Sequence, residues 1–457
     1  MKNRISVLLL LILFCAGCKK DFINQESTVQ NASNASFAVN RKPNVIFILA
    51  DDVGYENPAF DGGQSYVTPN LDLLASVSTR FTACHSSPIC SPSRIALLTG
   101  KYNQRNYTRW GLLDSTQKTI ANLFHDNGYT TCVAGKWQIT GNDASIHSFG
   151  FDKYIIFDYT EDPFSEHGDD DVNHPRYFHP HVSSDSTKGK FWDSTFTNQF
   201  YGPDLYESYS EKFMDNAKTH QKPFFLYYSS ALCHAPFCPT PLDAQFNAWI
   251  QNPFNKRASG NFYPSMMQYM DILIGKLLHH ADSLGVLSNT YVVFVGDNGT
   301  PAGITSKWKN ASGKIVSVQG GKGTTQETGT HVPLIIKGIG KGVDTGLVDF
   351  PDFMYSLADM AGIARPDTTV YGHLDAVSFM ANAAQRRTWS YDAYPGVYAT
   401  FWQYWSQTIT RKVYINNSNL YSLDWPNPET AIPGNQQTLQ DKSTKKMLNN
   451  ILVLEQQ

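Results

Sequence analysis

The sequence lacks an excess of charge of either sign. Its 457 residues include 37 Lys and Arg against 40 Asp and Glu, a formal net charge of −3. Proteins that bind nucleic acid carry a basic surface, so the composition does not support a nucleic-acid partner. Internal repeats and low-complexity blocks are also missing after residue 42. A chain of this length fits one large α/β domain with an appendage, or two domains.

A long apolar run is missing as well. The apolar run over residues 5–16 is too short to cross a bilayer as a helix. Lys2 and Arg4 precede it, and a basic start followed by a short apolar run is typical of an export signal. We therefore expect the mature protein to be exported.

The end of this run carries a cleavage pattern. Cys15-Ala16-Gly17-Cys18 resembles a bacterial lipoprotein cleavage site, with Cys18 as the lipidated residue. Ordinary secretion, with cleavage in the same region, is the alternative. We expect a signal peptide over 1–17 and a polar, flexible tether over 18–42. This predicts a periplasmic or cell-surface protein that touches the membrane only through an N-terminal lipid anchor.

The cysteines lack the spacing of a zinc site. There are seven, of which Cys15 leaves with the signal and Cys18 would carry the lipid. Besides Cys90, discussed below, the remaining ones are Cys84, Cys132, Cys233 and Cys238. An oxidising compartment permits disulfides, but four cysteines allow three pairings and the sequence does not choose among them.

Apolar runs alternate with helical patterns along most of the chain. The continuous apolar run over 44–50 is typical of a strand buried on both faces of a parallel sheet. Further strands are predicted at 130–134, 224–229 and 291–295, and helices at 71–77, 119–127, 205–218 and 265–284. The alternation predicts an α/β fold with a mixed, largely parallel sheet sandwiched by helices.

The tail of the chain has a different pattern. Short strands are predicted at 388–391, 407–414 and 420–423, with a turn at 416–419 and a closing helix over 442–456. We expect a catalytic α/β domain over 43–365. A C-terminal subdomain over 366–457 would hold a small antiparallel sheet and one helix.

Polar residues follow four of the predicted strands. Asp51 and Asp52 follow the predicted strand over 44–50, and Lys136 follows the one over 130–134. His234 follows the strand over 224–229, and Asp297 with Asn298 follows the strand over 291–295. Ligands in open α/β sheets gather at the carboxyl ends of the strands. The sequence therefore predicts a polar site at this edge.

The most specific motif lies over residues 87–102. It reads Ser87-Pro88-Ile89-Cys90-Ser91-Pro92-Ser93-Arg94-Ile95-Ala96-Leu97-Leu98-Thr99-Gly100-Lys101-Tyr102. Pro92 and Ser93 before an apolar run predict a helix start, which places Cys90 where free N–H groups favour an anion. The motif resembles the signature of the type I, formylglycine-dependent sulfatases of the alkaline phosphatase superfamily. The resemblance extends over nearly all of residues 43–425.

The resemblance implies a function and a cofactor. Cys90 would be oxidised to a formylglycine aldehyde by a formylglycine-generating maturation enzyme. The chain would then hydrolyse a sulfate ester through a covalent sulfo-formylglycine intermediate. One divalent cation, Ca²⁺ as is usual in the family or else Mg²⁺, would be held by Asp51, Asp52, Asp297, Asn298 and the residue derived from Cys90.

The same resemblance assigns roles to four further residues. Arg94 would stabilise the alkoxide of the residue derived from Cys90 and the bound sulfate. Lys136 would contact the sulfate and the formylglycine hydroxyl, and Lys322 would lie on the leaving-group side. His234 would contact and protonate the leaving oxygen.

The sequence departs from the family pattern at two positions. Gln138 stands where the family has the His that acts as base in releasing sulfate; Gln cannot take a proton near neutral pH, although it could orient the hydroxyl. His147 is a weak candidate for the missing base. His331 stands where the family has Arg before Val-Pro, which we expect to affect packing. The His- and Asp-rich loop over 166–181 reads mainly as solvated, with sugar or metal binding as the alternative.

Three functions remain open on the sequence. The first is a sulfatase that acts on a sulfated carbohydrate. The second is a phosphomonoester or phosphonate hydrolase of the same superfamily, because sulfate and phosphate esters share tetrahedral geometry. The third is a glycan-binding lipoprotein without turnover, against which the retained Cys90, Arg94, both lysines and the cation ligands argue.

Overall fold

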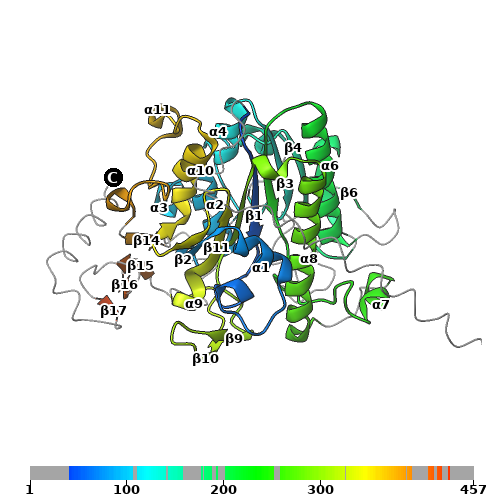
Figure 1. The fold of residues 1–457 in the computed structure, drawn as a ribbon, viewed down its shortest axis with the longest axis vertical. Helices are drawn as coiled ribbons and strands as arrows, with labels where there is room; N and C mark the ends of the chain where they lie inside the picture. The colour runs from blue at the N-terminus through cyan, green and yellow to red at the C-terminus, as the bar shows by residue number, and fades with distance from the viewer. Residues whose placement is uncertain are drawn as a thin grey trace, which may run out of the picture. The chain divides into compact units, whose positions relative to one another are not determined.

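A computed structural model gives the fold of the chain (Figure 1). It describes residues 41–106, 111–139, 143–157, 176–178, 180–187, 192–193, 201–251, 258–324, 326–387, 389–393, 410–415, 419–424 and 431–432. The predicted signal peptide, almost all of the tether and the closing helix over 442–456 lie outside these residues.

The centre of the fold is an 11-stranded sheet of mixed direction. In spatial order its strands are β12 (Gly342–Asp344), β2 (Thr79–His85), β11 (His331–Lys337), β8 (Thr290–Gly296), β1 (Asn44–Ala50), β7 (Phe224–Ser229), β3 (Thr130–Gly135), β4 (Lys153–Phe157), β5 (His181–Ser184) and β6 (Trp192–Asp193), while β13 (Val348–Asp349) pairs with β2. The central run β8-β1-β7-β3-β4 is parallel, and β11 and β5 flank it in antiparallel direction.

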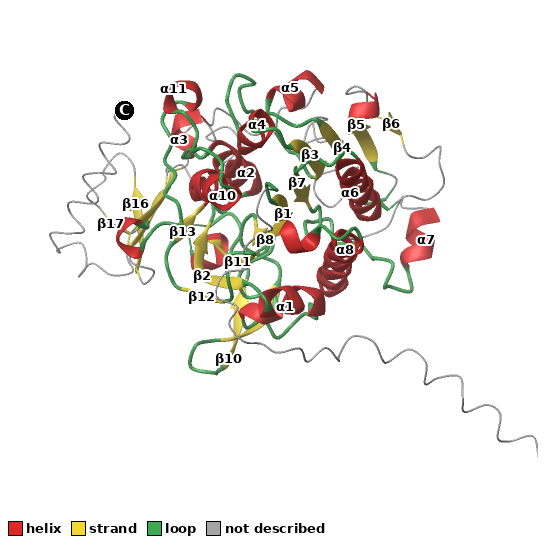
Figure 2. Ribbon diagram, turned by 45° about the horizontal axis from the view of Figure 1, so that its top comes forward, coloured by secondary structure: helices red, strands yellow, loops and turns green. Residues whose placement is uncertain are grey.

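Helices cover both faces of the sheet (Figures 1 and 2). They are α1 (Pro69–Ser76), α2 (Cys90–Thr99), α3 (Asn103–Asn106), α4 (Ile120–Asp126), α5 (Asp143–Ser148), α6 (Gly202–Thr219), α7 (Phe246–Gln251), α8 (Tyr263–Ser283), α9 (Glu327–Thr330), α10 (Phe353–Ala361) and α11 (Thr368–Tyr371). Short 3₁₀ turns are η1 (Ala59–Asp61), η2 (Asp185–Thr187), η4 (Gly260–Phe262), η5 (Leu287–Asn289), η6 (Phe350–Asp352) and η7 (Ala383–Gln385).

The central strand β1 shows how the two cores arise. Successive side chains of a strand point to opposite faces, so Phe47 packs in one core and Ile46 and Ile48 in the other. Helices α2, α4 and α10 contribute to the core of Phe47, and α1, α6 and α8 to the core of Ile46. Because both faces are covered, β1 must be apolar throughout, and its seven residues are all buried.

Local signals fix the ends of several helices. Thr119 and Asn122 form a capping box at the start of α4. Gly100 ends α2 and Gly362 ends α10, each with a left-handed backbone that glycine adopts without strain.

A separate antiparallel sheet comes from the tail of the chain. Its strands are β14 (Trp389–Ala393), β15 (Thr410–Ile415), β16 (Asn419–Asp424) and β17 (Ala431–Ile432). The small hairpin of β9 (Thr305–Lys309) and β10 (Ile315–Gln319) is also antiparallel.

The predicted fold class is confirmed: a mixed, largely parallel sheet between helices, with a small antiparallel sheet in the tail. The strands predicted at 44–50, 130–134, 224–229 and 291–295 correspond to β1, β3, β7 and β8. The prediction did not include β2 and β11, which extend the sheet beyond β8 in antiparallel pairing.

Beyond residue 365, the chain still packs against the first core. Leu374, Ala376 and Phe379 belong to the same buried cluster as Phe353. Arg387 also forms a buried ion pair with Asp352 at 2.6 Å. The division at 365/366 stays a prediction about separate folding units. None of the helices in the described part of the chain combines the length and the apolar composition needed to cross a membrane.

Candidate active site

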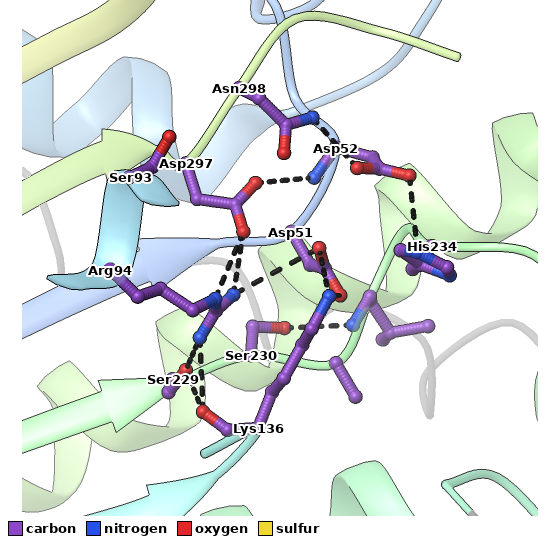
Figure 3. Close-up of polar contacts among 12 residues, drawn as sticks. Asp51, Asp52, Ser93, Arg94, Lys136, Ser229, Ser230, His234, Asp297 and Asn298 are labelled. Carbon is purple, nitrogen blue, oxygen red and sulfur yellow. Dashed lines mark hydrogen bonds and ion pairs between the residues drawn. The ribbon is translucent and has the colours of Figure 1, made fainter. Parts of the chain in front are cut away.

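The carboxyl ends of four parallel strands meet at one edge of the sheet and present polar side chains there (Figure 3). Asp51 follows β1, Lys136 follows β3, His234 follows β7 and Asp297 follows β8. Since β7 and β8 pair with β1 on its two sides and β3 pairs with β7, these ends are neighbours. The sequence prediction of a polar edge thus has a structural basis.

Helix α2 delivers Cys90 to the same edge. It begins at Cys90, after Ile89 in extended conformation, and all ten of its residues are buried. The Ser93 hydroxyl donates to the carbonyls of Ser87 and Ile89, which fixes the turn that leads into the helix. Burial raises the pKa of the Cys90 thiol, although Lys136 and Lys322 act in the opposite direction.

Arg94, one helical turn after Cys90, ties three strand ends together. Its Nε and Nη2 donate to Asp297 Oδ2 at 3.1 and 2.7 Å. Its Nη1 donates to the Lys136 carbonyl at 3.0 Å and to Ser229 Oγ at 2.5 Å. The guanidinium is fully buried, so these contacts hold α2 and the ends of β3, β7 and β8 in a fixed arrangement.

The acidic groups lie close together and are paired with lysines. Lys136 Nζ donates to both oxygens of Asp51 at 2.8 and 2.7 Å. Lys322 Nζ lies 2.7 and 2.8 Å from the two oxygens of Asp52. One oxygen each of Asp51, Asp52 and Asp297 lies within 4.8 Å of the others.

Asn298 completes this group. Its Nδ2 donates to Asp52 Oδ1 at 2.8 Å. Its Oδ1 is buried and has no hydrogen-bond partner among the described residues. Three carboxylates and one unpaired amide oxygen form the donor set that a hard divalent cation such as Ca²⁺ or Mg²⁺ prefers, so the residues fit such an ion.

The pKa values of the three acids differ. Burial would raise the pKa of Asp51, but Lys136 and Arg94 outweigh it and hold this pKa below its usual value. Burial raises the pKa of Asp52, and burial together with the charge of Asp51 raises that of Asp297 to about 6. A bound cation would favour the charged form of all three.

His234 is held in a defined orientation beside the acids. Its Nδ1 donates to the Ala235 carbonyl at 2.5 Å, and its Nε2 lies 3.9 Å from Asp52 Oδ2. The Tyr177 hydroxyl lies 2.6 Å from the His234 carbonyl oxygen, to which it donates. Burial, assisted by Lys322, Arg176 and Lys136, holds the pKa of His234 well below its usual value.

Lys322 reaches the site from a loop that is tied to its surroundings on both sides. The Lys322 amide donates to the Thr300 carbonyl at 2.9 Å, just after Asn298. The Gly323 amide donates to the Pro88 carbonyl at 2.9 Å, just before Cys90. The loop therefore bridges the cation ligands and the segment that carries Cys90.

Gln138 and His147 differ in their surroundings. Gln138 lies two residues after Lys136, is 2 % exposed and has a left-handed backbone with φ of 55°. His147, in α5, has its Nδ1 2.7 Å from the Phe151 carbonyl oxygen and packs edge-on against Tyr154, at the start of β4. The described contacts therefore associate His147 with β4, and the missing base stays unassigned.

The remaining predicted positions also have a place in the structure. His331 pairs with Glu327 at 2.8 Å and stacks on Tyr55 with ring centroids 4.3 Å apart, so its contacts are those of packing. Most of the His- and Asp-rich loop over 166–181 lies outside the described residues. In the described part of the chain, Cys84, Cys132, Cys233 and Cys238 are buried and free, like Cys90.

Sequence reasoning missed three residues of the site. Ser229 receives a hydrogen bond from Arg94, Tyr177 holds the His234 loop, and the buried Arg176 acts electrostatically on Asp51 and His234. A strand-terminal Ser gives no local signal. Arg176 and Tyr177 follow a polar loop in which an Arg is expected to be solvated.

Comparisons with known proteins identify the family of the chain and relate its fold to solved structures. The family model described as "Sulfatase" matches residues 43–363. Human arylsulfatase A is 31% identical over 365 residues, covering 74% of this chain and 68% of that protein. Mouse N-acetylgalactosamine-6-sulfatase is 29% identical over 364 residues, covering 74% and 66%. The solved structure of Ps i-CgsB in complex with k-i-k-neocarrahexaose has a TM-score of 0.66 at 22% identity and covers 91% of this chain and 93% of that one, which shows the shared fold.

Proposed function

The chain belongs to the sulfatase family and is a sulfuric ester hydrolase, and from this premise we propose that Cys90, converted to formylglycine, is its nucleophile. One observation carries the proposal. Cys90 lies buried at the N-terminus of α2, with an atom of Asp51 and one of His234 within 4.8 Å of its Sγ. A nucleophile at this point would meet the basic groups Lys136 and Lys322 and the candidate cation ligands together.

The proposed chemistry has two steps. One hydroxyl of the hydrated aldehyde loses its proton and attacks sulfur, an oxygen–sulfur bond forms, the bond from sulfur to the ester oxygen breaks, and that oxygen takes up a proton. The second hydroxyl then loses its proton, the carbonyl double bond forms again, and the bond from this carbon to the sulfate oxygen breaks, so that sulfate leaves with the electron pair. A covalent sulfo-formylglycine intermediate at position 90 thus divides one difficult displacement into two easier steps.

The side chains around Cys90 support charge stabilisation. Lys136 and Lys322 are fixed ammonium groups that would stabilise the negative charge on the transferring sulfuryl group. Four hydrogen bonds to protein groups engage all three guanidinium nitrogens of Arg94, so we propose that it acts by holding the site in place and through its charge. Gln138 would orient the hydroxyl without accepting its proton.

His234 would contact the leaving oxygen. Its Nδ1 carries a hydrogen, because a carbonyl oxygen can only accept, so in the neutral ring Nε2 has the lone pair. Protonation at Nε2 is therefore needed before His234 can give a proton to the leaving oxygen.

We propose that Asp51, Asp52, Asp297 and Asn298 hold one divalent cation, Ca²⁺ by family likeness. The unpaired Asn298 Oδ1 and the crowding of three carboxylates support it. When bound, the cation would polarise the sulfate group and the residue derived from Cys90.

The proposed substrate is a sulfated saccharide. The names of the N-acetylgalactosamine-6-sulfatase relative and of the saccharide complex of Ps i-CgsB support this class. We further propose export to the periplasm or cell surface with a lipid anchor at Cys18, and maturation by a formylglycine-generating enzyme. The pattern around residues 15–18 supports the anchor.

The deciding experiment measures sulfate release. The protein is expressed with a formylglycine-generating enzyme, conversion of Cys90 is confirmed by mass spectrometry, and a panel of sulfated mono- and oligosaccharides is tested beside phosphate monoesters. We expect sulfate release that falls by at least roughly 10³-fold in Cys90→Ala. The matched control Cys84→Ala, a buried cysteine in β2, should keep most of the activity. Faster hydrolysis of phosphate esters, or no release from fully converted protein, would contradict the proposal.

Removal of the cation tests the proposal that the site holds a divalent cation. After chelation we expect loss of activity, recovery on adding Ca²⁺, and a lower unfolding temperature. A ligand at 100 times its Kd stabilises the folded state by about 2.7 kcal/mol, so the thermal shift should be measurable. Activity unchanged after exhaustive chelation would contradict the cation proposal.

A further inference from the structure

The site contains a second group of potential metal ligands besides the cluster of oxygens. Cys90 Sγ, one ring nitrogen of His234 and one carboxylate oxygen of Asp51 all lie within 4.8 Å of one another. All three side chains are buried, with Cys90 at 1 % and His234 at 5 % exposure. Among the described residues, this is the group that brings a thiol and an imidazole together with a carboxylate.

The ligand types of this group differ from those of the oxygen cluster. Thiolate sulfur and imidazole nitrogen bind Zn²⁺ and similar ions, whereas Ca²⁺ and Mg²⁺ take oxygen ligands. Three protein ligands leave a fourth position for water, as in open zinc sites. The donor set therefore selects a different class of metal from the ion proposed above.

His234 is already arranged as a metal ligand would be. Its Nδ1–H donates to the Ala235 carbonyl, which fixes the tautomer and leaves the lone pair on Nε2. The Tyr177 hydroxyl holds the His234 carbonyl at 2.6 Å and the Ala231 carbonyl at 2.8 Å, so the loop that carries the ring is braced from two points. The ring therefore needs little rearrangement to bind a metal through Nε2, whereas Asp51 would have to give the metal an oxygen that now accepts from Lys136.

We propose that the unconverted protein binds one Zn²⁺-type ion through Cys90, His234 and Asp51, and that conversion of Cys90 abolishes this site. Binding replaces the thiol proton by the metal: the S–H bond breaks, a sulfur–metal bond forms and the proton goes to solvent. Formylglycine has no sulfur, so the mature enzyme lacks the ligand that defines the site. This part of the inference rests on the proposed conversion of Cys90.

Asp51 makes the two metal sites competitors. Its carboxylate belongs to the group with Cys90 and also to the oxygen cluster with Asp52 and Asp297. A zinc ion bound to Cys90 would thus weaken Ca²⁺ binding and hold position 90 as a metal thiolate. The unconverted chain would be in a metal-blocked, inactive form.

The test uses Co²⁺ as a spectroscopic probe for zinc. Full-length protein is expressed without a maturation enzyme, stripped of metal and titrated with Co²⁺. We expect one equivalent to bind, with a sulfur-to-cobalt charge-transfer band in the near ultraviolet, and Zn²⁺ to displace it. Excess Ca²⁺ should weaken cobalt binding through the shared Asp51.

Variants identify the ligands. Cys90→Ala should lose the charge-transfer band, and His234→Ala should weaken binding at least about tenfold. Cys238→Ala is the matched control, because Cys238 is a buried thiol four residues after His234 whose Sγ donates to the Pro236 carbonyl; it should keep the band. Thermal unfolding of each variant in the metal-free state shows whether it is folded.

The outcomes separate this inference from the proposed function. A band that persists in Cys90→Ala or disappears in Cys238→Ala, or no band in the unconverted wild type, would overturn the zinc site whether or not the converted enzyme releases sulfate. Failure of sulfate release would overturn the proposed function and leave the cobalt result valid. Fully converted protein should show no sulfur-to-cobalt band at Co²⁺ concentrations that saturate the unconverted form.

Discussion

The two edges of the central sheet differ in whether their charged side chains are buried or exposed. At the carboxyl edge, Asp51, Lys136 and Asp297 are fully buried and bonded to one another or to Arg94. At the amino edge, Arg41, Lys42, Lys218 and Lys222 line an open cavity of about 630 Å³ and are exposed. Both edges are polar, but only one removes its charges from water.

The difference has an energetic meaning. A buried charge costs several kcal/mol of desolvation and persists only where partners or a cation compensate it. The cations of the amino edge stay solvated. Lys218 in the last turn of α6, and Lys42, which donates to the carbonyl of the α4 cap residue Asn127, also complement the negative ends of these helices. Burial of charge, rather than its presence, therefore distinguishes the functional edge.

The largest loss of stability is expected from breaking the buried pair of Arg94 and Asp297 at the carboxyl edge. Arg94→Met removes the partner of Asp297 and leaves a buried carboxylate unpaired. We expect the free energy of unfolding to fall by about 3–5 kcal/mol, measured by denaturant titration. The matched control is Arg365→Met, which breaks the exposed pair with Asp359 and should cost at most about 1 kcal/mol. Equal effects of the two variants would contradict the contrast between buried and exposed charge.

Gln138→His tests the one position of the functional edge where a proton acceptor is missing. If Gln138 limits release of sulfate, a His there should raise kcat roughly tenfold or more. A His must be neutral to act as base, so the gain should be lost as the pH falls below the pKa of this His, which burial beside Lys136 should place below the usual value of about 6.5. Gln138→Ala, which adds no base, should show no such pH-dependent gain. An unchanged kcat in Gln138→His would mean that another group already serves as base.

A smaller effect, on the pH dependence of stability, is expected from replacing Glu207 in α6. The C-terminus of this helix lies beside the cavity of the amino edge. Burial and the neighbouring Glu211 raise the pKa of Glu207 from 4.5 to about 8. Between these values the folded state keeps a proton that the unfolded state has lost, so this group makes stability fall as pH rises from about 5 to 8. Glu207→Gln imitates the protonated carboxyl and should flatten this fall, measured as unfolding temperature against pH.

Glu211→Gln serves as the comparison for Glu207. Without the neighbouring carboxylate, the pKa of Glu207 should drop, and the loss of stability toward pH 8 should become smaller. Identical pH profiles for wild type and both variants would show that Glu207 is not held protonated in the folded protein.

The smallest effect is expected at the amino edge itself. The double variant Lys218→Ala with Lys222→Ala removes two exposed charges of the cavity. Surface changes of this kind usually alter stability by no more than about 0.5 kcal/mol each, and the sulfatase activity should stay unchanged. A loss of activity comparable to that of a carboxyl-edge variant would show that exposed charge at this edge also takes part in function.

Much of this architecture could be predicted from the sequence. The continuous apolar run of β1 predicted a strand that is covered on both faces. The polar residues after β1, β3, β7 and β8 predicted a site at the ends of these strands. These signals are local, because burial on both faces and the end of a strand leave their mark on consecutive residues. The strand β2 was missed because its burial is mixed and it has no comparable run. The strand β11 has five consecutive apolar residues, but Pro333 within them argues against a central strand.

What the sequence by itself determined is the inventory of the site: Cys90 at a helix start, the aspartates, both lysines and His234. Only the tertiary structure decided which of them face each other. The bond from Arg94 to Asp297 joins residues 203 positions apart, and the bond from Asn298 Nδ2 to Asp52 joins residues 246 positions apart. These hydrogen bonds form only once the strands have assembled and each buried polar group has met a partner. No pattern of neighbouring residues in the sequence predicts them.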